Sequence, residues 1–535
     1  MAILFAAGFA LSAAVSALAV DAAALYHERR VVQSVVDLAA LTAARDPGRA
    51  LDIAQTVLVD AGLLAGTDKT GLIVTPGHYA ADPTLAADQR FAPGAGPVNA
   101  VRVHFEKPGT LYFASAFSTE PTIAASGIAS VTPEVSFSLG SRLASLDGGI
   151  ANAVLGQLLG TGLSLSVMDY NALASARVEA LDFLDALALQ LGLDAGTYDD
   201  LLSMQAGPGP IAAALKSLTG GTANSALSAL ALDRSGSSLD LGKLIGLGQL
   251  GGLEIGSSDA ALGMSLSVLE ILSAAAALAD GERQVSLNLG ASLPGLASLK
   301  LDLAIGEPPQ GGGWFTVGPA GTMVRTAQTR LRITAQLLGG AILLNAGVRL
   351  PIWLDLAHAE AQVISATCPE GGTDRGSAVI AVRPGAVHAA IGEMSAEQLK
   401  SFGWLPPAQP VRLIDVLLLR VTASAQVEVA RPEPVAVTFT SADIAEGRLK
   451  TVGTSGIATS IMTSLLGDLN LGVNVLGLGL ASPAVIAQAV RGLVTPLAPV
   501  LDLTLDAVLD TLGLGIGEAD VRVYGVRCTS PVLVG

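Results

Sequence analysis

The first apolar run of the chain is long enough to cross a bilayer, and it continues into a patterned helix. Residues Ala2 to Val20 carry no charge, and Ala22 to Tyr26 resume the run after Asp21. Roughly 20 apolar residues suffice for a membrane-spanning helix. Polar and apolar positions then keep helical spacing as far as Ala44. The pattern predicts one helix of about 40 residues and ~60 Å, half in lipid and half clear of it.

The segment that follows predicts a helix end, a second helix and a hairpin. Arg45-Asp46-Pro47-Gly48 is typical of a helix terminus, and Asp followed by Pro also favours the start of a helix over 48–64. Residues 65–115 are predicted to form strands. Within them, 101–105 and 111–113 alternate around a Lys-Pro-Gly turn, which predicts a hairpin.

The remaining pattern mixes the two periods without regular alternation. Residues 150–232 are predicted to be mostly helical, including an amphipathic helix over 182–191 that Gly192 ends. Period-two alternation predicts strands within 284–305, 329–367, 411–440 and 520–526, and helices are predicted near 455–467 and 482–512. The predicted fold class is α+β, in which a long N-terminal transmembrane and stalk helix precedes a large body of antiparallel sheets with packed Ala/Leu-rich helices.

Stretches rich in Gly and Pro predict where the chain divides. They lie at 92–97, 207–210 and 306–313. We predict a transmembrane and stalk segment at 1–46, a first α+β extracytoplasmic region at 47–206, a helical and strand middle region at 207–310, and a second α+β extracytoplasmic region at 311–535.

Composition narrows the class of partners. Only 14% of residues are charged, mean hydropathy is +0.57 and net charge is −16. Beyond the first run, Ser, Thr, Asp or Gly interrupts the apolar residues every few positions, which predicts buried cores and no further spans. Because Lys and Arg do not cluster and aromatic residues make up only 4%, no nucleic-acid partner is expected.

The two cysteines, Cys368 and Cys528, are a disulfide candidate. Neither belongs to a CxxC motif or a Cys/His cluster, so a zinc site is not predicted. An oxidising compartment would favour their pairing, and two buried, unpaired thiols are the alternative.

Two kinds of processing signal are relevant to the N-terminus. Ala17-Leu18-Ala19 satisfies the small-x-small pattern of a cleaved signal peptide, but no basic region precedes the run and the helix continues through the cut. Prepilin processing would require Glu five residues after the cut that follows Gly8, where Ala13 stands. The helix is therefore expected to stay attached.

The end of the span resembles a known family. The stretches AVDAAALY (19–26) and RVVQSVVDLAALTAA (30–44) are similar to the TadG-like N-terminal segment of Flp (Tad, tight adherence) pilus-assembly proteins. That segment has an Asp closing the span, then a Tyr, a Gln and an Asp, matched here by Asp21, Tyr26, Gln33 and Asp37. TPGHY (75–79) and NAVRV (99–103) resemble strands that follow in these proteins. The resemblance implies a cytoplasmic N-terminus and a periplasmic body. The chain departs from the family by starting Met1-Ala2-Ile3, without basic residues before the span.

Motifs that carry chemistry are few. Asp233, Ser235 and Ser237 have the DxSxS spacing of a metal-ion-dependent adhesion site, but the residues before them are Ala/Leu-rich and helix-like. The GxGxxG match over 246–251 lacks a strand-to-helix context. No GxSxG, P-loop or HExxH motif occurs, and the histidines are isolated. We therefore predict no catalytic residue, no cofactor and no metal site.

The leading hypothesis is a non-enzymatic, single-pass component of a Flp/Tad-type pilus assembly or secretion apparatus in the bacterial inner membrane. Its expected partners are pilin-like and pilus-assembly membrane proteins and inner-membrane lipid. Five residues just above the span are candidates for pairing with neighbouring helices: Asp21, Arg29, Arg30, Gln33 and Asp37. The alternatives are a membrane-anchored periplasmic enzyme or lipid-binding protein, and a metal-dependent adhesin with the DxSxS site.

Overall fold

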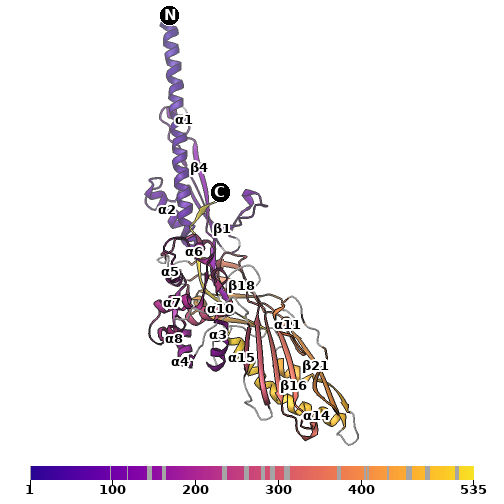
Figure 1. Cartoon of the computed structure of the whole chain (residues 1–535). Coiled ribbons are helices and arrows are strands. Elements are labelled where there is room, and N and C mark those ends of the chain that lie inside the picture. The colour runs from indigo at the N-terminus through magenta and orange to yellow at the C-terminus, as the bar shows by residue number, and fades with distance from the viewer. Residues whose placement is uncertain are drawn as a thin grey trace.

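One helix, α1 (Ala2–Ala43), begins the chain and projects well beyond the body (Figure 1). The computed structural model describes residues 2–534 except for 95, 97, 117, 141–147, 160–163, 232–237, 258–263, 279–283, 289–295, 307–313, 370–374, 403–404, 406–408, 430–432, 454–460, 476–481 and 512–516. The helix ends where the sequence predicts, just before Arg45-Asp46-Pro47.

The second half of α1 packs on a small sheet. A buried stripe of Val and Ala, spaced four, three, one and three residues apart, faces the sheet: Val32, Val36, Ala39, Ala40 and Ala43. The helix α2 (Ala50–Asp60) joins the same core after the short 3-10 helix η1 (Pro47–Arg49). The sheet is antiparallel, in the order β2 (Phe91–Pro93), β1 (Leu72–Tyr79), β3 (Ala100–Pro108), β4 (Thr122–Ser130) and β26 (Val532–Leu533). The end of the chain thereby returns to the sheet beside α1.

Two further sheets enclose a second hydrophobic core, separate from the core beneath α1. The first has the order β23 (Leu449–Gly453), β25 (Glu518–Cys528), β5 (Pro133–Leu139), β13 (Phe315–Gly318) and β9 (Ile245–Gly246). The second has the order β14 (Met323–Arg325), β17 (Glu360–Thr367), β18 (Ser377–Arg383) and β22 (Val435–Phe439), and α12 (Ser441–Ala445) contacts β25. A disulfide joins Cys368, just after β17, to Cys528 at the end of β25, with their Cα atoms 5.8 Å apart.

Residues 148–278 are mainly helical. The helices are α3 (Gly148–Leu159), α4 (Val167–Ser175), α5 (Ala180–Leu191), α6 (Tyr198–Leu202), α7 (Pro208–Leu218), α8 (Gly221–Ala231), α9 (Leu241–Leu244), the 3-10 helix η4 (Gly248–Gly252) and α10 (Val268–Leu278). Two ribbons link them, β6 (Arg177–Glu179) with β10 (Ser265–Ser267) and β7 (Gln205–Ala206) with β8 (Leu239–Asp240). Gly192 caps α5 at a φ of 74°, as the sequence predicts.

An eight-stranded antiparallel sheet forms the end of the molecule farthest from α1 (Figure 1). Its order is β11 (Gln284–Asn288), β12 (Leu296–Ile305), β15 (Thr329–Leu337), β16 (Val348–Leu356), β19 (Val387–Ile391), β21 (Leu419–Val429) and β20 (Val411–Val416), and β24 (Asn470–Val475) also pairs with β21. One face packs on α13 (Ile461–Gly467) and α14 (Pro483–Val494), and α15 (Ala498–Thr511) packs on α13 in the same core.

The other face of this sheet holds α11 (Ala396–Lys400) through two arginines. Arg330 in β15 pairs with Asp355 in β16 at 2.9 Å, and both side chains are almost fully buried. Arg332 pairs in the same way with Asp302 at 2.7 Å. Arg330 also donates to the carbonyls of Gln398 and Ser401, and Arg332 donates to that of Met394. The two arginines are thus held in the sheet by cross-strand ion pairs and bind α11 and its flanking residues through backbone carbonyls.

Several local predictions need correction. The second strand of the predicted hairpin is β4, not 111–113, because those residues turn toward α1. The predicted linker at 207–210 is the first turn of α7, which begins at Pro208, since proline suits that position. The predicted helix over 48–64 is shorter, and 482–512 divides into α14 and α15 around Thr495–Leu497. The mixed architecture with antiparallel sheets is confirmed. The division at 46, 206 and 310 stays a prediction.

Among the described residues, the helical stretch long and apolar enough to cross a membrane is Pro483–Thr511. Its buried residues, which include Ile486, Val490, Leu501 and Leu505, belong to the core that covers one face of the eight-stranded sheet. α1 is not among the helices identified in this way, and its insertion in a membrane stays a prediction.

Candidate functional site at the base of the first helix

The carboxylate of Asp21 is buried where α1 emerges from the body. It accepts hydrogen bonds from three consecutive backbone N–H groups, those of Tyr112 at 2.9 Å, Phe113 at 3.1 Å and Ala114 at 2.7 Å. Only 3% of the residue is exposed. Successive N–H groups at the start of a turn form a concave site for an anion, and here the anion belongs to the same chain. Asp21 therefore fixes the β3–β4 connection against the helix.

A second acidic residue repeats the contact two turns along α1. Glu28 pairs with Lys107 at the end of β3 and accepts from the backbone N–H of Thr110 at 2.9 Å. Burial raises the pKa of the Glu28 carboxyl, but the hydrogen bonds from Lys107 and Thr110 outweigh burial, so its pKa lies below the ordinary value. Asp21 and Glu28 are seven residues apart and share one face of the helix.

A third contact joins the helix to the middle of β4. The amide nitrogen of Gln33 donates to the carboxylate of Asp37 at 2.8 Å and to the carbonyl of Ser126 at 2.9 Å. Gly127 lies so close that a Cβ there would stand 2.7 Å from the Asp37 carboxylate. Glycine at this position lets strand and helix approach, and the Gln33 amide uses the space.

The predicted helix-pairing residues therefore have two kinds of environment. Asp21, Gln33 and Asp37 contact the sheet of their own chain, whereas Arg29 and Arg30 are exposed. Pairing with neighbouring helices stays a prediction, for which Arg29 and Arg30 have the free surface. The sequence reasoning missed Glu28 and its Lys107 partner. The seven-residue spacing from Asp21, in line with the buried stripe, was the signal that could have identified Glu28.

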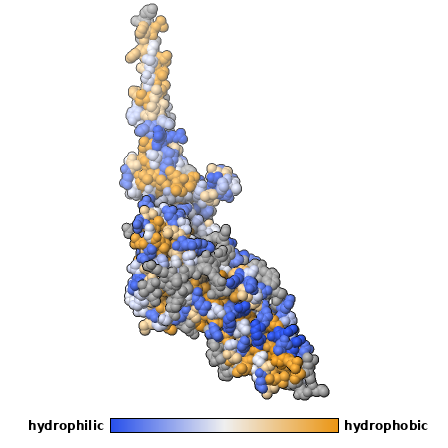
Figure 2. Space-filling view, viewed as in Figure 1, coloured by the Kyte–Doolittle hydropathy of each residue, from blue (hydrophilic) through white to orange (hydrophobic). Residues whose placement is uncertain are grey.

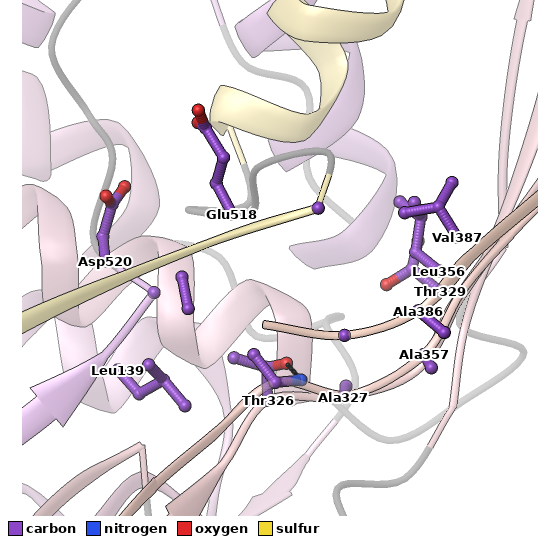
Figure 3. A pocket seen from close by; sticks show the side chains of 15 residues that line it. Leu139, Thr326, Ala327, Thr329, Leu356, Ala357, Ala386, Val387, Glu518 and Asp520 are labelled. Atoms are coloured by element: carbon purple, nitrogen blue, oxygen red, sulfur yellow. Dashed lines mark hydrogen bonds between the residues drawn. The ribbon is translucent and has the colours of Figure 1, made fainter. Parts of the chain in front are cut away.

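The described part of the chain has two cavities of interest. The smaller, about 30 Å³, lies between Leu139, Thr326, Leu356 and Asp520 and has room for about one water molecule (Figure 3). The larger, about 540 Å³, is open and polar, and four arginines line it: Arg177, Arg375, Arg522 and Arg527. Glu270 pairs with Arg522 at 2.7 Å and with Arg177 at 3.8 Å, and Glu134 pairs with Arg527 at 2.6 Å.

The described residues give no support to the other candidate motifs. Asp233, Ser235 and Ser237 lie outside the described residues. The GxGxxG match forms β9 and the short η4 turn, so no α-helix presents its N-terminus to a phosphate. Within the described ranges no three His, Cys, Asp or Glu side chains gather as a metal site would require. Of the tryptophans, Trp353 is buried in a small cluster with Leu399 of α11, and Trp404 lies outside the described residues.

These features describe an α+β protein built on a projecting apolar helix whose base is locked into a small antiparallel sheet. Residues 39–129, from the end of α1 through β1 to β4, match a family model described as "Putative Tad-like Flp pilus-assembly". The match confirms the Tad-like resemblance seen in the sequence and supports a role in pilus assembly. Residues 147–277, nearly all of α3 to α10, match a model described as "Domain of unknown function (DUF8293)". No curated protein and no solved structure matches the chain.

Proposed function

We propose that this chain is a non-enzymatic component of a Flp/Tad-type pilus assembly or secretion apparatus. In this proposal α1 anchors it in the bacterial inner membrane, and the body lies in the periplasm and contacts other parts of the apparatus. The Tad-like match over residues 39–129 is the observation that carries the proposal. The matched segment is the sheet that holds the base of α1, so anchor and sheet form one functional unit.

The projecting part of α1 has the dimensions and surface of an anchor. Its uncharged residues, 2–20, span about 28 Å at 1.5 Å per residue, close to the roughly 30 Å of a hydrocarbon core. Its large side chains face outward from the part of the chain that the structure describes, with Leu4 75%, Phe5 81% and Phe9 77% exposed (Figure 2). Exposure of so much apolar surface to water is energetically unfavourable, whereas exposure to lipid is favourable. The Ala, Gly and Ser between these side chains allow close packing with pilin-like helices.

The disulfide supports a periplasmic body. Disulfides persist in oxidising compartments such as the periplasm and are rare in the cytosol. Cys368 and Cys528 bond to each other and pack against the core beneath α1. The proposed topology, with the N-terminus in the cytoplasm, places this disulfide in the periplasm.

Fractionation and protease protection test the proposal. The full chain should remain in the membrane pellet after alkaline carbonate extraction, and protease added to spheroplasts should digest its body. A variant that lacks residues 2–20 should be recovered in the soluble fraction, because it keeps the sheet but loses the anchor. Detergent extracts of the full chain should co-purify pilus-assembly membrane proteins, identified by mass spectrometry. Carbonate extraction of the full chain, or protection of its body, would contradict the topology.

The arginine-lined cavity favours a second candidate, a membrane-anchored periplasmic protein that binds an anionic ligand. Its 540 Å³ lies within the size range of small-molecule sites, and Arg375 is exposed at its rim. Arginine suits carboxylates and phosphates through its forked donors. Thermal shifts of the protein and of Arg375→Ala with citrate and with inorganic phosphate test this candidate. A shift that the substitution abolishes supports it, and unchanged melting counts against it.

A further inference from the structure

The β3–β4 connection presents two aromatic rings to solvent beside the end of the uncharged helix. Tyr112 is 65% exposed and Phe113 is 53% exposed. Their backbone N–H groups are at the same time bound to the buried carboxylate of Asp21. The backbone is therefore fixed against α1 while the rings point away from the core. An exposed Tyr-Phe pair on a fixed loop calls for a surface outside the chain to cover it.

The order of side chains along α1 matches the layers of a bilayer. The uncharged segment ends at Val20, and Asp21 with its aromatic loop follows directly. Tyr26, which is 67% exposed, lies about 7–8 Å farther along the helix. Exposed His27, Arg29 and Arg30 come next, and a band of hydrophilic surface follows the apolar projection (Figure 2). Aromatic side chains favour the membrane–water interface, and cationic ones favour anionic headgroups.

We propose that the loop 110–114 lies in the lipid interface, so that Tyr26, Tyr112 and Phe113 form an aromatic collar where α1 leaves the bilayer. This inference rests on the proposed membrane insertion of α1 and specifies how the sheet meets the membrane. The surface that the collar binds is the headgroup and upper acyl region of anionic phospholipid. Asp21 and Glu28 hold the loop against α1. The sheet therefore contacts the membrane through both α1 and the loop, and these two contacts restrict its orientation on the membrane.

Asp21 is the positioning residue of the collar. Its three N–H contacts, each at 3.1 Å or less, hold the rings at the depth where the span ends. The close approach of Leu25 to Gly109 brings the same loop against the helix, since a Cβ on Gly109 would stand 2.6 Å from the Leu25 side chain. Loss of the Asp21 carboxylate should release the rings from the interface without removing α1 from the bilayer.

Spin-label depth measurements on the full chain test the collar. Single nitroxide labels are placed by Phe9→Cys, Phe113→Cys and Leu533→Cys in separate samples, since the disulfide occupies both native cysteines. The protein is reconstituted in vesicles of phosphatidylcholine and phosphatidylglycerol, without other proteins. Leu533 is the matched control, because it is an exposed apolar residue that pairs with Ala129 at the other end of β4. Collision of each label with oxygen and with a water-soluble nickel chelate reports its depth.

The collar predicts hydrocarbon depth at residue 9, interfacial depth at residue 113 and a water-exposed label at residue 533. In an Asp21→Ala background the label at 113 should become several-fold more accessible to nickel, while the label at 9 stays buried. Asp46→Ala is the matched substitution and should change neither label, because the Asp46 carboxylate accepts a hydrogen bond from Arg49 in its own turn and lies past the C-terminal end of α1, far along the helix from the loop. If residue 113 reads aqueous while residue 9 reads deep, the collar is overturned and a protein surface becomes the candidate cover. If residue 9 itself reads aqueous, the proposed anchor is overturned.

Discussion

Removal of the disulfide should destabilise the part of the body that packs against the sheet beside α1. Cys368 and Cys528 are 160 residues apart in sequence, and both pack partly buried against the core formed by α1, α2 and their sheet. In the chain-entropy treatment, a cross-link that closes a loop of this length stabilises the folded state by about 5 kcal/mol at 25 °C. The double substitution Cys368→Ser and Cys528→Ser removes this constraint with little change in volume.

Thermal unfolding in detergent measures the effect. Unfolding entropy is about 2.1 cal/mol/K per residue, so a loss of about 5 kcal/mol lowers the Tm by roughly 4–5 °C if all 535 residues unfold together. A smaller cooperative unit would show a larger shift. The double variant and the reduced wild-type protein should melt at the same temperature, and reductant should not affect the variant. An unchanged Tm after verified reduction would refute the reasoning.

Three further predictions address individual contacts. Asp355→Ala should lower the free energy of unfolding by about 3–5 kcal/mol in a denaturant titration, because it leaves the buried Arg330 without its carboxylate. The control is Asp415→Ala, which removes a carboxylate from exposed ion pairs and should lower the free energy of unfolding by less than about 1 kcal/mol. Gly127→Ala should destabilise by about 1–3 kcal/mol through contact with Asp37, whereas Gly492→Ala, which meets no atom within 4 Å, should not destabilise; equal melting of Gly127→Ala and wild type would contradict the packing described. Because the pKa of Glu28 is lowered, its contribution is complete above the ordinary value of 4.5 and is lost as pH falls through the lowered value. The Tm of the wild-type protein should therefore drop below about pH 4.5 more steeply than that of Glu28→Gln, and parallel pH profiles would contradict this assignment.

The sequence was most informative where local pattern decides structure. The spacing of Val32, Val36 and the alanines predicted the helix through Ala43, and Gly192 correctly marked the end of α5. Period-two alternation likewise located β11, β12 and β15 to β17. These features depend on periodicity and helix caps, which are determined by residues close together in the sequence.

Features that depend on contacts between distant residues were beyond the sequence pattern. Residues 111–113 alternate like a strand, but the N–H groups of Tyr112 and Phe113 donate to Asp21, which lies some ninety positions earlier. Nothing in the local sequence indicates that β26 pairs with β4, or that Arg330 meets Asp355, because both follow from strand order. The role of Asp21 within its own chain was missed for the same reason. From the sequence alone, a polar residue just above a span is as consistent with a partner on a neighbouring helix as with a partner in its own chain.

Piliation of the host strain tests the central claim most directly. The gene is deleted, and the strain is complemented with the full chain or with the variant that lacks residues 2–20. If the chain is a membrane-anchored part of a Flp/Tad-type apparatus, electron microscopy should show loss of Flp pili in the deletion strain. The full chain should restore them, and the truncated variant, accumulating to the same level, should not. Normal piliation in the deletion strain would contradict the account.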